Sequence, residues 1–238
     1  MKVALIGYGK MGKAIEKIVV ERGHSIVSII DLDNQEDFQS DAFKSADVAI
    51  EFSTPSSAYN NYLMCFAANV PVVAGTTGWL EHLDEVKSLC ENEGKTFFYA
   101  PNYSLGVNLF FTVNHYLAKL MNNFPQYDVA VSETHHIHKL DAPSGTAIVL
   151  VEDIFRQISR KKQWTLEKTN HPDDLFIEVI REGEAPGTHE IIYESDIDSI
   201  QIKHNSKSRL GLALGAVLAA EFTHGKKGFL GMKDLLQF

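Results

Sequence analysis

The stretch that decides the fold reads VALIGYGKMG and runs from Val3 to Gly12. Its first four residues are apolar, which is typical of a short buried strand. Three glycines follow in the spacing G-x-G-x-x-G, and apolar residues recur at helical spacing from Lys13 onward. A strand, a glycine-rich turn and a helix in this order indicate the first βα unit of a nucleotide-binding sheet.

Each glycine of this turn has a physical role. Gly7 permits the tight turn, Gly9 lets a pyrophosphate approach the backbone, and Gly12 lets the helix pack closely on the strand. The pyrophosphate would then meet the free N–H groups at the positive end of the helix. Asp31 ends a second apolar run about 20 residues later, where a carboxylate can accept hydrogen bonds from ribose hydroxyls. The alternative is a plain turn followed by a strand-ending acid.

The residues around Asp31 also bear on which dinucleotide binds. Asp33 lies nearby and Leu32 follows directly, so no arginine is placed to bind a 2′-phosphate. We therefore predict NADH as the preferred cofactor. NADPH stays open as the second choice, because Lys10 could reach a phosphate.

Strands and helices alternate through the first hundred residues. The apolar runs are unbroken, which is typical of parallel strands buried on both faces. They lie at Ser25–Ile30, Val48–Phe52, Pro71–Ala74 and Thr96–Tyr99. The segment Gly75-Thr76-Thr77-Gly78 follows the fourth strand, where ligands of open parallel sheets bind, so we expect it to line the nicotinamide end of a cleft. A loop without a function is the alternative reading.

The pattern changes near Asn102. A helix is expected over about 107–121, then an alternating segment over 127–133, a helix ending near Ile158, and strand-like segments over 176–180, 190–194 and 199–204. The fold class is therefore α/β: an N-terminal Rossmann-type doubly wound parallel sheet, followed by a C-terminal α+β domain with an open mixed sheet.

Composition narrows the classes of partner. The net charge of −9 disfavours nucleic acid and membrane surfaces, which are polyanionic. The chain has two cysteines, too few for a disulfide scaffold, and we expect both to be reduced. No run approaches 18 apolar residues. These features predict a cytoplasmic protein.

The most informative stretch reads ETHHIHKLDAPSGT and spans residues 133–146. A helix is expected to begin just after it, so Ser144, Gly145 and Thr146 should present hydroxyl and N–H groups to an anion. His135 and Lys139 beside them could bind charge and donate protons. An anionic ligand would raise the pKa of both groups and keep them protonated.

Two other readings of this stretch stay open. A zinc site is disfavoured, because the spacing H-H-x-H on a non-helical segment fits zinc poorly and no cysteine supports it. A solvated polar loop is the third reading. The remaining histidines are scattered, and we expect them to be surface or structural residues: His24, His115, His171, His189, His204 and His224.

Several motifs together resemble the 4-hydroxy-tetrahydrodipicolinate reductase family, also called dihydrodipicolinate reductase, over nearly the whole length. They are the glycine loop ending Lys10-Met11-Gly12, Phe52-Ser53-Thr54-Pro55, Gly75-Thr76-Thr77-Gly78, Ala100-Pro101-Asn102-Tyr103-Ser104, Gly106-Val107-Asn108, and above all His135-His136 through Thr146. Two departures are visible: many members have one more residue in the glycine loop, and many have a basic residue where Leu32 stands.

The resemblance implies hydride transfer from NAD(P)H to a cyclic unsaturated dicarboxylate in the diaminopimelate and lysine pathway. It implies His135 as the catalytic acid/base and Lys139 as the proton donor. It further implies that the substrate is bound by His136, Ser144, Gly145 and Thr146. On the cofactor side it implies Gly7, Tyr8, Gly9, Lys10, Met11, Gly12, Asp31, Gly75, Thr76, Thr77, Ala100, Pro101, Asn102, Tyr103 and Arg209. No metal is expected.

The resemblance also implies a domain plan. Residues 1–104 and 209–238 would form the dinucleotide-binding domain, with the last helix returning to it. Residues 105–208 would form the substrate-binding and oligomerisation domain, which joins a homotetramer. Two rival functions stay open at this point: another NAD(P)-dependent dehydrogenase on the same fold, and a non-catalytic NADH-sensing module.

Overall fold

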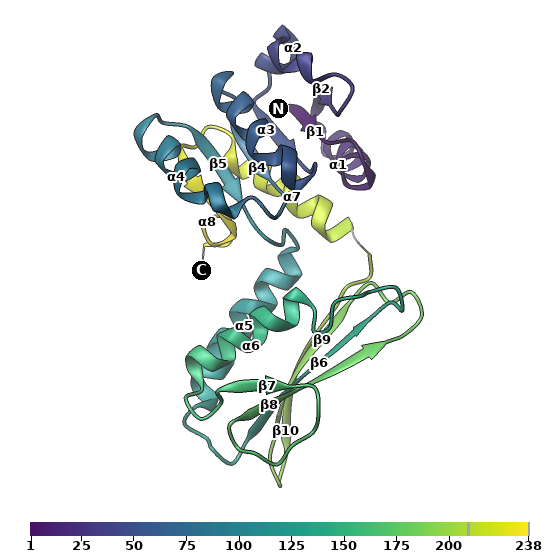
Figure 1. The fold of residues 1–238 in the computed structure, drawn as a ribbon, viewed down its shortest axis with the longest axis vertical. Coiled ribbons are helices and arrows are strands. Elements are labelled where there is room, and N and C mark those ends of the chain that lie inside the picture. Colours follow the sequence, from purple (N-terminus) through teal and green to yellow (C-terminus); the bar gives the residue numbers. More distant parts are fainter. Residues whose placement is uncertain (209, 238) are drawn as a thin grey trace. The chain divides into compact units, whose positions relative to one another are not determined.

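The computed structural model describes residues 1–208 and 210–237, and the chain forms two compact units (Figure 1). The first unit comprises Met1–Leu105 together with Leu210–Phe238, and the second comprises Gly106–Arg209. The second unit is therefore an insertion into the first. That the first unit binds the dinucleotide and the second binds the substrate stays a prediction.

The first unit is built on a six-stranded sheet in which every pairing is parallel. The strand order is β11-β5-β4-β3-β1-β2. This arrangement confirms the predicted Rossmann-type sheet and adds one short strand, β11, that the apolar pattern did not predict. The strands are β1 (Lys2–Ile6), β2 (Ser25–Ile30), β3 (Val48–Glu51), β4 (Val72–Ala74), β5 (Thr96–Tyr99) and β11 (Gly228–Leu230).

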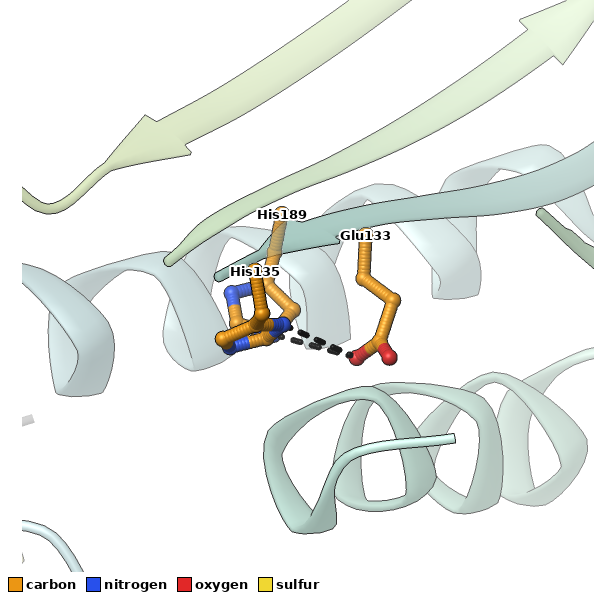
Figure 2. Close-up of side chains that lie close together, drawn as sticks. All are labelled: Glu133, His135 and His189. Atoms are coloured by element: carbon orange, nitrogen blue, oxygen red, sulfur yellow. Dashed lines mark ion pairs between the residues drawn. The ribbon is translucent and has the colours of Figure 1, made fainter. Parts of the chain in front are cut away.

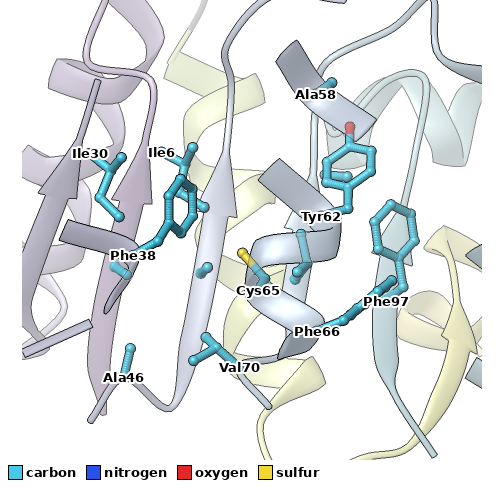
Figure 3. Packing of buried hydrophobic residues seen from close by; sticks show 14 of the residues in the cluster. Ile6, Ile30, Phe38, Ala46, Ala58, Tyr62, Cys65, Phe66, Val70 and Phe97 are labelled. Atoms are coloured by element: carbon cyan, nitrogen blue, oxygen red, sulfur yellow. The ribbon is translucent and has the colours of Figure 1, made fainter. Parts of the chain in front are cut away.

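Helices cover both faces of this sheet. They are α1 (Lys10–Glu21), α2 (Asp41–Lys44), α3 (Pro55–Ala67), α4 (Leu83–Asn92), α7 (Leu210–Thr223) and α8 (Met232–Leu236), with 3₁₀ turns η1 (Gln35–Gln39) and η2 (Leu80–His82). Successive β1 side chains enter different cores: Ala4 and Ile6 face α3, whereas Val3 and Leu5 face α1 and α7. Figure 3 shows the first core, where Tyr62, Cys65 and Phe66 of α3 lie over the strands. Burial on both sides explains the unbroken apolar runs.

The second unit has a five-stranded mixed sheet in the order β10-β9-β6-β8-β7. The β6·β8 and β7·β8 pairs are parallel, and the β6·β9 and β9·β10 pairs are antiparallel. Both long helices pack on one face of this sheet around a separate apolar core (Figure 1). The elements are α5 (Leu105–Met121), β6 (Asp128–His135), α6 (Gly145–Gln157), β7 (Gln163–Thr165), β8 (Asp174–Arg181), β9 (Thr188–Glu194) and β10 (Ser199–Asn205).

Three boundaries differ from the sequence expectation in ways that matter for the site. Helix α1 begins at Lys10 rather than Lys13, so part of the glycine motif is helical. Strand β6 continues to His135, and helix α6 begins at Gly145. Within residues 1–208 and 210–237, no helix has the length and apolar character needed to cross a membrane.

Candidate active site

The polar site of the second unit begins where the apolar core of β6 ends. Alternate β6 side chains face the helices, so Val129, Val131, Glu133 and His135 share one face. The first two are core residues, and the last two are buried polar residues at 0% and 8% exposure. The chain therefore changes from core to polar site along a single strand face.

Neighbouring strands supply the partners of these two residues. In the antiparallel ladder Glu133 lies opposite His189 of β9, and in the parallel ladder His135 lies beside Arg181 of β8. The His135 and His189 rings meet edge to face, with centroids 5.0 Å apart. His189 is only 5% exposed, so of the two expected alternatives, surface or structural, it is not a surface residue, and it belongs to the buried cluster.

The turn before α6 is held against this cluster. Ser144 is the N-cap residue, and its Oγ accepts a hydrogen bond from the Ala147 N–H at 3.2 Å. The Ser144 N–H donates to both Glu133 oxygens, at 3.2 and 3.0 Å, and Ser144 Oγ lies 3.1 Å from His189 Nε2. A Cβ added to Gly145 would meet no atom of the described residues within 4 Å, so there is open space beside the first residue of α6.

Glu133 is the centre of charge in this cluster. Arg181 Nη2 donates to one carboxylate oxygen at 3.0 Å, and the other oxygen lies 3.7 Å from His135 Nδ1 and 3.6 Å from His189 Nε2 (Figure 2). Burial alone would raise the pKa of Glu133. The nearby His189 ring and hydrogen bonds from Ser144 and Arg181 outweigh burial and hold this pKa at about 2. The carboxylate is therefore ionised at neutral pH.

For His135, burial outweighs the effect of the neighbouring charge on its pKa. Burial lowers its pKa from the ordinary 6.5 to about 4, although the Glu133 charge acts to raise it. The ring also needs the absence of a side chain at Gly187, where an added Cβ would lie 3.0 Å from His135 Nε2. Without a bound anion, His135 is a neutral imidazole in a tightly shaped space.

Glu133, His135 and His189 place ligand-type atoms within 4.8 Å of one another, a grouping that could hold a metal ion. The Glu133 oxygens already accept hydrogen bonds from Ser144 and from the Arg181 cation. A second cation at that carboxylate would meet the repulsion of the guanidinium. These contacts favour an ion-pair network here rather than a metal site. The three residues also differ from the H-H-x-H histidines that the sequence offered as zinc ligands.

Lys139 lies in the loop between β6 and α6. Its Nζ donates to Asp141 at 2.8 Å, and Arg181 donates to the Asp141 carbonyl at 2.7 Å. His136, on the same loop, has a buried Nδ1 with no hydrogen-bond partner among the described residues. The predicted residues of this stretch thus cluster around one polar turn, and an anionic ligand can compete with Asp141 for the Lys139 ammonium.

The glycine loop of the first unit has the close approaches that a dinucleotide site needs. Gly7 has φ of 87°, and a Cβ there would lie 2.1 Å from the Phe52 carbonyl oxygen; a Cβ on Gly12 would lie 2.3 Å from the Gly7 oxygen. Gly9, in contrast, has nothing within 4 Å of an added Cβ. The Asp31 carboxylate accepts the Tyr8 N–H at 3.2 Å. These residues fit a nucleotide that approaches at Gly9.

A cavity of about 490 Å³ opens beside this loop. Its lining includes three of the predicted loop residues and two of the predicted threonines: Gly9, Lys10, Met11, Phe52, Ser53, Pro55, Gly75, Thr76 and Thr77. Under it lies Glu51, fully buried, which accepts hydrogen bonds from Ser53 N–H at 3.0 Å and Thr76 Oγ1 at 2.9 Å. Burial raises the pKa of Glu51, and these hydrogen bonds oppose the rise.

The remaining cofactor predictions lie in different surroundings. Ala100 and Tyr103 are each 2% exposed, and the Tyr103 hydroxyl donates to the Ala74 carbonyl at 2.7 Å. These two side chains are core residues of the first unit, whereas Pro101 is exposed. Asn102 is half-buried and its side chain accepts the Ser104 N–H at 2.9 Å. Arg209 lies outside the described residues.

Sequence reasoning missed four buried or half-buried polar residues: Glu51, Glu133, Arg181 and His189. Two of them carried a readable signal. The alternation that begins at Val129 and Val131 places Glu133 on the same strand face, which marks it as a buried acid. Glu51 lies within the predicted buried strand Val48–Phe52, whereas Arg181 and His189 join the cluster only through strand pairing.

Both halves of the chain match known family models. Residues 1–103 match the family model for the N-terminus of dihydrodipicolinate reductase, and residues 106–236 match the model for its C-terminus. A 4-hydroxy-tetrahydrodipicolinate reductase of Christiangramia forsetii is 47% identical over 236 residues, covering 99% of this chain and 98% of that protein. The Staphylococcus aureus reductase is 34% identical over 93% of this chain and 94% of its own length.

Solved structures agree on the fold. A dipicolinate-bound dihydrodipicolinate reductase from Paenisporosarcina matches with a TM-score of 0.76 at 22% identity, covering 97% of each chain. A diaminopimelate dehydrogenase of C. glutamicum matches with a TM-score of 0.53 at 14% identity, over 97% of this chain and 92% of that one. With both halves matched by the family models and a close relative over its full length, the chain belongs to the dihydrodipicolinate reductase family.

Proposed function

We propose that this chain reduces 4-hydroxy-tetrahydrodipicolinate through the polar turn of the second unit, with His135 as acid/base and Lys139 as proton donor. Family membership supports the reaction, because the curated relatives are named 4-hydroxy-tetrahydrodipicolinate reductases. The observation that carries the residue assignment is one arrangement: His135, the Lys139 loop and the α6 N-terminus all contact the Glu133–Arg181 pair.

The substrate site is proposed at the N-terminus of α6. Ser144, Gly145 and Thr146 present the positive end of the helix, which favours a carboxylate. His136 lies on the adjoining loop, and its buried Nδ1 has no hydrogen-bond partner in the part of the chain that the structure describes. A solved relative of this fold has dipicolinate bound, a planar molecule with two carboxylates, and that is the ligand class such a site fits.

The chemistry needs two things from these residues. The 4-hydroxy substrate must first lose water to give a conjugated dianion. That dianion is a poor hydride acceptor because it is already negative, so fixing its carboxylates with Lys139 and N–H dipoles offsets the charge. Hydride addition then brings one further negative charge, which a single proton from Lys139 or His135 neutralises. A bound nicotinamide cofactor would supply the hydride. A dianion beside His135 would raise the pKa of the imidazole, which burial depresses in the unliganded chain.

Preference for NADH over NADPH is the finer proposal for the cofactor. Asp31 ends β2 with its carboxylate held by the Tyr8 and Leu32 N–H groups. Leu32 itself is 77% exposed and apolar. An acid that accepts ribose hydroxyls, followed by no cation, disfavours a 2′-phosphate at this edge.

A homotetramer formed through the second unit is also proposed. Residues on the sheet face away from α5 and α6 include the half-buried Phe176 and Ile192 and the 36%-exposed Ile180, placed there by alternation and strand register. Light scattering of the purified protein should give four times the mass of 26.6 kDa. A monomer at micromolar concentration would contradict this assembly.

The reaction itself is tested with the purified wild-type chain. We expect oxidation of NADH on addition of freshly generated 4-hydroxy-tetrahydrodipicolinate, followed at the absorbance of the reduced nicotinamide, and slower oxidation of NADPH. Turnover of a hydroxyl or amine substrate in place of the dicarboxylate would favour the rival dehydrogenase function. Tight NADH binding with no turnover of any of them would favour the sensing module.

A further inference from the structure

Glu133 is a fully buried charge for which the proposed reaction gives no direct role. It is 0% exposed, and its pKa of about 2 keeps it anionic. Burying an ionised carboxylate is unfavourable unless it is paired and hydrogen-bonded. Its partners come from three different elements: Arg181 of β8, His189 of β9 and Ser144 at the start of α6. A charge that joins three elements at one point fixes their relative geometry.

The first thing Glu133 fixes is the turn that precedes α6. Both of its oxygens accept the Ser144 N–H, and the same Ser144 caps α6 through Ala147. His189 lies within hydrogen-bonding distance of the Ser144 hydroxyl from the other side. The N-terminal turn proposed to hold a substrate carboxylate is therefore anchored through a single residue.

Glu133 also fixes the loop that carries Lys139, which it reaches through Arg181. Arg181 donates one hydrogen bond to Glu133 and another to the Asp141 carbonyl, and Asp141 pairs with Lys139. Arg181 thus connects the loop to the buried carboxylate. Since the guanidinium presents its donors in a fixed fork, the two acceptors are held in a defined relation.

The third group that Glu133 holds in position is the His135 imidazole. Its Nδ1 lies 3.7 Å from Glu133 and has no hydrogen-bond partner among the described residues. Gly187 leaves room for the ring on its Nε2 side. The imidazole is therefore confined between the carboxylate and the start of β9, with its Nδ1 toward the negative charge (Figure 2).

We propose that Glu133 and Arg181 act as a positioning pair for the reaction: together they hold His135, the Lys139 loop and the Ser144–Thr146 turn in the geometry that the dicarboxylate requires. The inference rests on the proposed function, and it adds two residues that do not themselves contact the substrate.

The pair also has an electrostatic signature. The charged and titratable groups that act on His135 are Glu133 on its own strand, Arg181 on β8, His189 on β9 and Lys139 in the loop. The carboxylate raises the pKa of His135, and the guanidinium lowers it. Removing the anion should therefore lower the His135 pKa from about 4, whereas removing the cation should raise it. These opposite shifts test the contacts of His135 with the pair, and the rate of the reaction tests the positioning itself.

The experiment compares Glu133→Gln with Arg181→Met in the full-length chain. Glutamine keeps the size of Glu133 and can still accept the Ser144 N–H, so Glu133→Gln removes chiefly the charge. We expect kcat/KM for the dicarboxylate to fall roughly tenfold or more in each variant, because a small misplacement of reacting groups lowers the rate strongly. Dipicolinate binding should weaken by a similar factor, while NADH affinity stays within about twofold.

The matched control is Glu184→Gln. Glu184 pairs with His138 at 3.1 Å, but both side chains are exposed, so this variant also removes a glutamate beside a histidine. We expect it to match the wild type. Circular dichroism and thermal melts verify the fold of every variant, and histidine-selective ¹³C NMR follows the pH titration of His135.

The outcomes distinguish failure of the proposed reaction from failure of the positioning pair. If the wild type does not reduce the dicarboxylate, the proposed function fails. If the wild type is active and the folded Glu133→Gln variant matches it in kcat/KM, the positioning pair is wrong. The pair is also wrong if His135 titrates at the same pH in both variants, or shifts in the same direction.

Discussion

At the scale of single residues, the Lys139 ammonium forms an ion pair that an anionic ligand can replace. The ammonium is 22% exposed and pairs with Asp141, which is 59% exposed. An exposed ion pair contributes little to stability, about 0–1 kcal/mol. Lys139 can therefore exchange Asp141 for a substrate carboxylate at small cost, which suits a proton donor.

Replacing Lys139 with alanine should leave the fold intact and remove most of the activity. We expect kcat to fall roughly a hundredfold to ten-thousandfold, the usual contribution of a positioned acid. Steady-state kinetics with the dicarboxylate, beside a thermal melt, measures both effects. Lys162→Ala is the control, since Lys162 forms an equivalent surface pair with Asp173; equal kinetics in the two variants would reject the role of Lys139.

Acid should destabilise the folded chain in two overlapping windows. The pKa of His135 falls on folding from 6.5 to about 4, so the stability that favours its neutral form is lost as pH falls through that range. The pKa of Glu133 falls from 4.5 to about 2, so its contribution is complete above 4.5 and is lost towards 2.

Urea melts between pH 8 and pH 4 should therefore show a declining free energy of unfolding, with a weaker decline in a His135→Gln variant. A wild-type stability that stays level from pH 6.5 to pH 4 would disprove the depressed pKa of His135. The Glu184→Gln variant should follow the wild-type curve, because its carboxylate is exposed.

At the scale of elements, the glycine loop separates a folding requirement from a binding requirement. A Cβ on Gly12 would overlap the Gly7 carbonyl, so Gly12→Ala should lower the melting temperature by several degrees. A Cβ on Gly9 meets nothing in the free chain, so Gly9→Ala should keep the melting temperature. It should instead raise the KM for NADH, because the methyl group would occupy the approach of the pyrophosphate. Equal melting temperatures of the two variants would contradict this division.

Much of the fold follows from local pattern at this scale. The apolar runs predict five of the six parallel strands, and β11 escapes because only two large apolar residues, Phe229 and Leu230, stand between glycines there. Only part of the candidate site can be predicted from the sequence. His135, Lys139 and Ser144 occur in one stretch of chain, whereas Arg181 and His189 join them through strand pairing across more than 40 residues. No local periodicity encodes which strands become neighbours, so these partners could not be predicted.

At the scale of the whole molecule, the two units have separate apolar cores. Cores that share no residue can melt as separate cooperative steps. Scanning calorimetry should then show that NADH raises the melting temperature of one transition and dipicolinate that of another, because each ligand stabilises only the unit that binds it. A single transition that responds equally to either ligand would show that the units unfold together.

The insertion of the second unit into the first has a consequence for biosynthesis. Helix α7 and Met232 complete the core that β1 and α1 begin, so the first unit lacks part of its interior until the end of the chain has been translated. The second unit is continuous, and all of its strands leave the ribosome earlier. A chain truncated after Ser208 and released from the ribosome should therefore hold a finished second unit and an open, chaperone-dependent nucleotide sheet.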